Sequence, residues 1–212
     1  MNYDLDTDID AVAFDAEPSL LGDEQRDTLG EVAKTISAEA ADAFSKIVGR
    51  KVGAKVPRLD VLPLGEAVES LGGPADAVTA AWMSVVGQIE ASVLLLFDNE
   101  SEATISELLE VDRDSEMGHS ALAEIANIIG TKYVNGIAAS CGMTFEPEPP
   151  EVASGMLGAV LGTVLAMSTV QTNYAVVVDT ELKIDKSNCT IRFLFIPSDT
   201  SVETLISSLG TQ

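Results

Sequence analysis

The chain has 212 residues, of which 46% are apolar and 22% charged, enough for one domain of ordinary size or two small, closely joined ones. Thirty-four acidic residues against twelve basic ones give a net charge of −22, which argues against nucleic acid and anionic membranes as partners. Because dissolved salt screens such self-repulsion, the acidity indicates a halophilic protein from a salt-rich cytoplasm rather than an acidic binding site.

The residues that metal and thiol chemistry need are scarce. Cys141, Cys189 and His119 are the only cysteines and the only histidine, too few for a zinc or iron-sulfur site, so we expect no metal and no cofactor of the chain's own. Acidic residues stand where a signal peptide needs basic ones, which predicts a cytoplasmic location. Residues 1–20 hold acids and no base, so we expect a mobile acidic tail. The alternative is a docking peptide that folds on a partner.

The predicted elements alternate between helical and strand-like patterns. In chain order they are a helix over 27–49, a helical stretch over 61–73, a strand over 89–98, a short helix over 103–111, a helix over 120–142, an uncharged run over 152–170, strands over 174–184 and 189–197, and a short helix over 201–210. Each half follows the order helix, helix, strands, short helix. This order predicts an α+β fold in which two similar halves share a mainly antiparallel sheet with packed helices.

The uncharged run 152–170 is long enough to span a bilayer. Its glycines, serines and threonines dilute its hydrophobicity, and no Lys or Arg anchors either end. We therefore expect a helix buried against its neighbours rather than a membrane span.

The two halves also share a residue pattern. The pairs separated by one offset of 93 positions are Asp27 with Ser120 (120 − 27), Glu31 with Glu124 (124 − 31), Lys34 with Asn127 (127 − 34), Gly49 with Gly142 (142 − 49) and Pro57 with Pro150 (150 − 57). A single offset for the whole set indicates an internal duplication.

One side of the second repeated helix is polar but nearly uncharged. Ser120, Glu124 and Asn127 fall at i, i+4 and i+7, within about 60° of one another around a helix, while the apolar residues point away. Solvent faces of amphipathic helices are usually polar, so an ordinary surface is the alternative to a site. An ordinary face in so acidic a chain would carry several carboxylates, and this one carries a single carboxylate, which favours a site.

The same residues form a spaced motif: Ser or Asp, three residues, Glu, two residues, Asn, twenty-two residues, Pro. Ser120, Glu124, Asn127 and Pro150 satisfy every element. On this motif and its duplication the chain resembles the CheC/CheX/FliY family of chemotaxis phosphatases, and within it the CheC branch, which carries the motif twice. The resemblance covers residues 21–212, which we expect to form one domain of two repeats, about 21–115 and 116–212. With the charge, it points to a halophilic archaeon as the source.

The resemblance implies hydrolysis of the phosphoaspartate of phosphorylated CheY, a receiver domain that holds its own magnesium. In that scheme Asn127 orients the attacking water, and Glu124 pairs with the receiver's active-site lysine. Ser120 bounds the helix face, and Pro150 shapes the supporting loop. His119 points about 100° away from the polar side and is incidental.

The first copy of the motif departs from the family pattern at one position. Asp27, Glu31 and Pro57 are present, but Lys34 stands where the family has an amide. The first site is therefore expected to be degenerate. Two alternatives follow: an adaptor that binds CheD, and a component of the flagellar or archaellar switch related to FliM.

The charge predicts that folding depends on salt. Thirty-four acids repel one another over a Debye length of about 30 Å at 0.01 M ionic strength and about 3 Å at 1 M. We expect the melting temperature, followed by circular dichroism, to rise markedly from dilute buffer to molar potassium chloride. A melting temperature that does not change with salt would remove the halophile interpretation.

Overall fold

A computed structural model describes residues 22–167, 173–184 and 187–208; the predicted tail over 1–20 lies outside these residues. The helices and strands are, in chain order, α1 (Asp23–Val48), β1 (Val52–Pro63), α2 (Leu64–Ser70), β2 (Ala77–Gly87), β3 (Ala91–Asp98), α3 (Asn99–Leu108), α4 (Glu116–Ser140), β4 (Phe145–Pro147), β5 (Glu151–Met156), α5 (Leu157–Met167), β6 (Tyr174–Ile184), β7 (Ser187–Pro197) and α6 (Asp199–Ser208).

The predicted duplication is confirmed element by element. The offset of 93 carries the first residue of α1 onto that of α4 (116 − 23), β1 onto β4 (145 − 52) and α2 onto α5 (157 − 64). After α5 the second half is longer, so that β6 follows β2 by 97 positions (174 − 77). The strand β1 of the first half is represented in the second half by the two short strands β4 and β5.

The two halves interleave in one antiparallel sheet of order β1-β6-β7-β3-β2-β4, in which β5 also pairs with β2. The first strand of each half pairs with a strand of the other half, and β3 lies beside β7 at the centre with Leu94 opposite Leu194. The α+β fold with two halves sharing a sheet is confirmed. The repeat boundary near residue 115 stays a prediction.

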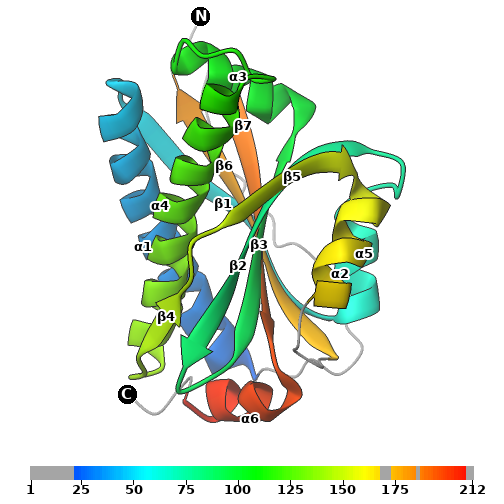
Figure 1. The fold of residues 1–212 in the computed structure, drawn as a ribbon. Coiled ribbons are helices and arrows are strands. Elements are labelled where there is room, and N and C mark those ends of the chain that lie inside the picture. The colour runs from blue at the N-terminus through cyan, green and yellow to red at the C-terminus, as the bar shows by residue number, and fades with distance from the viewer. Residues whose placement is uncertain (1–21, 168–172, 185–186, 209–212) are drawn as a thin grey trace, which may run out of the picture.

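The helices cover both faces of this sheet (Figure 1). Alternate residues of β3 point to opposite faces, as strand geometry requires. Val93, Leu95 and Phe97 belong to the core beneath α1 and α4. Leu94 and Leu96 belong to a smaller core beneath α2 and α5.

The prediction of one buried helix over 152–170 is wrong. The chain is a strand as far as Met156, paired with β2, and the helix α5 begins only at Leu157. Its far end, 168–170, lies outside the described residues. Helical α5 buries one side on the sheet and exposes the other, including Leu165. Among the described helices none is both long and apolar enough to cross a bilayer.

Three further strands were not predicted: β1, β2 and β4. The edge strand β1 carries exposed Lys55 and a register shift between Lys55 and Arg58, the residues that flank Pro57. In the second half the equivalent strand is interrupted outright, between Pro147 and Glu151. Proline cannot donate a ladder hydrogen bond, so both copies of this edge strand lose their regular pattern near the motif proline.

Helices α1 and α4 pack antiparallel to each other at close range. Gly136 of α4 supplies the space, because a Cβ atom there would lie 2.2 Å from Cγ1 and Cδ1 of Ile36 in α1. Buried hydroxyls join the same helices, with Ser37 Oγ 2.5 Å from the Tyr133 hydroxyl, which also bonds Thr180 of β6. Burial raises the pKa of Tyr133, so this hydroxyl stays protonated and neutral. The two helices are thereby tied to each other and to the sheet.

This contact predicts that Gly136→Ala is destabilising. The branched Ile36 side chain has one strongly preferred χ1 rotamer in a helix, so overpacking should cost about 1–3 kcal/mol in the free energy of unfolding. Gly30→Ala is the matched control, because nothing lies within 4 Å of its added Cβ and helix propensity should contribute about 0.5–1 kcal/mol of stability. Denaturant titration measures the free energy of unfolding of both variants. An equal change in the two variants would show that the close contact at Gly136 does not limit stability.

Candidate active site

The start of α4 is held in place by its own cap and by the preceding loop. Ser115 Oγ accepts a hydrogen bond from the Gly118 amide at 3.0 Å, which satisfies a free donor of the first turn. A Cβ atom at Gly118 would lie 2.3 Å from the carbonyl oxygen of Asp112, so only glycine allows the loop to pack this closely. The position of the next turn, where the motif begins, follows from this contact.

The predicted site residues of the second half lie along the outward side of α4. Ser120 and Glu124 are exposed and Asn127 is half-buried. Leu122, Ile125 and Ile129 are buried against the sheet. The helix thus presents a hydroxyl, a carboxylate and an amide on one surface, which we call the α4 face and define as Ser120, Glu124 and Asn127.

The flanks of the α4 face differ. Lys132 Nζ lies 3.3 Å from Glu39 Oε2 of α1 and so marks the flank toward α1. At about 100° per residue, Asn127 lies about 140° around the helix from Lys132, on the side away from α1. Helix α4 also contacts β4 and β5, and Pro150 lies between these two strands. Pro150 therefore lies in the loop beside the helix.

Met117 belongs to the same surface and was missed by the sequence interpretation. Its side chain is 69% exposed, and it lies seven residues before Glu124, within about 20° around the helix. The i, i+7 spacing could have revealed it. An exposed methionine next to polar groups provides an apolar contact for a partner surface.

The first copy has a different surface on α1. Asp27, Glu31 and Lys34 are all exposed, and Lys34 Nζ lies 2.7 Å from Glu31 Oε1. The hydrogen bond to Glu31, and then its charge, raises the pKa of Lys34, so the lysine remains a cation at neutral pH. The carboxylate of this copy is already paired with a neighbour on its own helix.

The two cysteines of the chain are unsuited to thiolate chemistry. Burial raises the pKa of Cys189 to about 12 and also raises that of Cys141, so neither is a thiolate at neutral pH. Across the described ranges 22–167, 173–184 and 187–208, no cluster of three His, Cys, Asp or Glu side chains could hold a metal ion. The groups that are present can bind, orient and hydrogen-bond.

The α4 face is also convex, because it is the outer side of a helix that packs on a sheet (Figure 1). An apolar hollow lies elsewhere among the described residues, lined by residues such as Leu29, Ile137 and Leu205. A convex surface does not enclose a small molecule. Its ligand is more readily the surface of another macromolecule.

Comparison with known proteins agrees with this arrangement. Residues 117–154 match the CheC-like family. The chain is 29% identical over 199 residues to the CheY-P phosphatase CheC of Bacillus subtilis (strain 168), covering 89% of this chain and 95% of that protein. These matches support a likeness to the CheC/CheX/FliY family. The predicted resemblance is thus confirmed, and the halophilic archaeal source stays a prediction.

Two further proteins extend the likeness over most of the chain. The chain is 25% identical over 193 residues to CheC1 of Halobacterium salinarum (strain ATCC 29341 / DSM 671 / R1), covering 86% of this chain and 94% of that protein. The crystal structure of Thermotoga maritima FliY superposes with a TM-score of 0.70 at 18% identity, covering 90% and 98% of the two chains. The matched segment 117–154 contains Met117 and all four predicted second-half site residues, and their first-half counterparts lie outside it.

Proposed function

We propose that this chain accelerates hydrolysis of the phosphoaspartate of phosphorylated CheY, with the α4 face as its catalytic surface. The likeness to a CheY-P phosphatase over most of the chain supports the reaction. The observation that carries the assignment to α4 is the contrast between the helices: Glu124 and Asn127 are presented together on α4, whereas Lys34 occupies the amide position on α1.

The reaction needs a water molecule in line with the scissile bond. The water oxygen forms a bond to phosphorus while the bond from phosphorus to the aspartyl oxygen breaks, which releases inorganic phosphate and the receiver's carboxylate. Magnesium, which the receiver itself binds, neutralises charge on the phosphoryl oxygens. A partner can therefore accelerate the step by positioning alone.

Asn127 is the group proposed to position the water. An amide both donates and accepts hydrogen bonds and carries no charge, so it can hold a water between two fixed atoms without adding charge beside the phosphoryl group. Half-burial of Asn127 restricts its rotamers more than full exposure would. Lysine in the same position of α1 can only donate, and it repels the cationic lysine of a receiver.

Glu124 is proposed to pair with the receiver's active-site lysine, which fixes the register of the two proteins. Among the described residues Glu124 makes no ion pair, so its carboxylate is available to a partner. Glu31, its counterpart, is bound by Lys34. Ser120 and Pro150 support this surface without contacting the reacting atoms. A role as an adaptor for CheD or for the switch stays a prediction that nothing in the structure favours.

Replacing the water-orienting amide should remove catalysis. Asn127→Ala is expected to lower the acceleration of CheY dephosphorylation by about 100-fold, the scale on which misplacement of a reacting group acts. Lys34→Ala is the matched control at the equivalent position of α1 and should leave the rate nearly unchanged. Phosphate release from phosphorylated CheY measures both, and full activity of the Asn127 variant would refute the assignment.

Restoring the amide on α1 tests whether the first copy of the motif can still become catalytically active. Lys34→Asn removes the cation, frees Glu31 and should raise the rate per chain up to about twofold if the two copies act independently. The substitution is best tested in a double variant that also carries Asn127→Ala, because any phosphate release that this variant accelerates must then come from the α1 surface. Release by the double variant confirms a latent site, and its absence shows that α1 has diverged at more than one position.

A further inference from the structure

Basic residues are concentrated in one short segment of this acidic chain. Five of the twelve, Lys46, Arg50, Lys51, Lys55 and Arg58, lie between Asp42 and Asp60, and no acid lies among them. Lys46, Arg50, Lys51 and Lys55 are exposed. These four residues, at the end of α1 and the start of β1, are called the basic corner below.

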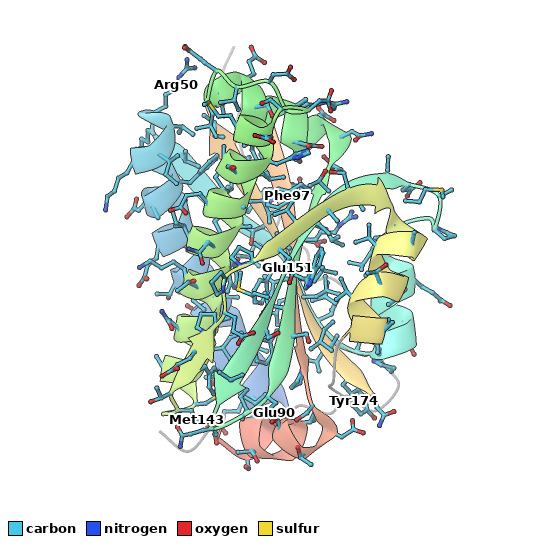
Figure 2. All side chains as sticks on the ribbon, viewed as in Figure 1. Arg50, Glu90, Phe97, Met143, Glu151 and Tyr174 are labelled. Carbon is cyan, nitrogen blue, oxygen red and sulfur yellow. The ribbon has the colours of Figure 1, made fainter. Side chains whose placement is uncertain are left out.

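The basic corner lies at the same end of the molecule as the α4 face. The ion pair between Glu39 of α1 and Lys132 of α4 shows that these two residues lie at the same height along the antiparallel helices. Lys46 is seven residues beyond Glu39, and Ile125 is seven residues before Lys132, so each lies about 10 Å farther along in the same direction. Figure 2 shows Arg50 at this end, where α4 begins.

Lys46 also lies on the appropriate side of α1. Seven residues return a helix to within about 20° of the same direction, so Lys46 shares the stripe of Glu39, which reaches toward α4. Lys46, contributed by the other half of the chain, therefore lies on the α1 flank of α4 at the level of Glu124.

The second half of the chain has no counterpart of the basic corner. The positions 93 residues beyond the four basic residues hold no base: they are Ala139, Met143, Thr144 and Glu148. The end of α4 that lies beside the degenerate surface of α1 is therefore neutral or acidic. Of the two equivalent corners, only the one beside the start of α4 carries this group of four bases.

Acidic groups nearby limit which of these bases are effective. Lys55 lies directly opposite Glu181 in the β1–β6 ladder. Asp42 precedes Lys46 by one turn of α1, and Asp112, Asp114 and Glu116 surround the start of α4. Lys46 and Lys51, which are both exposed, are therefore taken as the principal bases of the corner.

We infer that the basic corner docks the acidic surface around the receiver's phosphoaspartate, so that one receiver contacts both helices. The inference rests on the proposed function. A phosphoaspartate site presents phosphoryl oxygens and the carboxylates that hold its magnesium, and a protein of charge −22 repels such a surface at long range. The basic corner reverses the sign of the charge at the point of contact. One half of the chain thereby recognises the receiver while the other half provides the chemistry.

The test compares Lys46→Gln/Lys51→Gln with a control of equal charge change, Thr204→Glu/Ser207→Glu. Both control residues are exposed on α6, which lies at the opposite end of the molecule (Figure 1). At about 0.1 M salt the corner variant should raise KM for phosphorylated CheY about fivefold without changing kcat, because rim charges act on encounter rather than on the chemical step. The effect should shrink in molar potassium chloride, and Lys46→Arg/Lys51→Arg should restore the wild-type KM.

Binding of CheY activated with beryllofluoride, measured by titration calorimetry, separates this inference from the proposed function. Weaker binding by the corner variant but not by the α6 control supports the docking surface, even if no variant accelerates phosphate release. Equal binding and equal KM in the corner and control variants would overturn the inference and leave the proposed catalytic role of Asn127 standing.

Discussion

The antiparallel contact between α1 and α4 is the constraint on which the arrangement of this protein depends. Gly136 lets the helices approach, and the buried hydroxyls of Ser37, Tyr133 and Thr180 tie them to the sheet. Because the helices belong to different halves and run in opposite directions, the end of one lies beside the start of the other. Residues far apart in the chain thus meet on one surface.

The duplication explains how the two copies could change independently. In the shared sheet each half supplies its first strand as a partner for the other half, so both halves are needed for the fold. The need to keep the shared sheet restricts which residues can be buried. The exposed positions of α1 and α4 are not restricted in this way, and at these positions the two helices differ: α1 has Lys34 where α4 has Asn127.

The distribution of charge also sets the outward side of α4 apart from the rest of the surface. Most of the chain is strongly acidic, and on α4 the outward surface has a single carboxylate with a neutral amide, a hydroxyl and an exposed methionine. In high salt the range of charge interactions falls to a few ångströms. Recognition then depends on groups in direct contact, which gives weight to how Glu124 and the neighbouring bases are placed.

The sequence by itself determined the duplication, the polar side of α4 and the motif, because a shared offset and the 3.6-residue period are local properties of the chain. It also located β6 correctly, since buried strands are rich in β-branched residues. It did not reveal β1, β2, β4 or β5; β1 and β5, for example, pair with β6 and β2, which are far away in the chain. Only the tertiary structure decided that the halves interleave and that Lys46 lies level with Glu124, because both depend on packing between elements that no local pattern records.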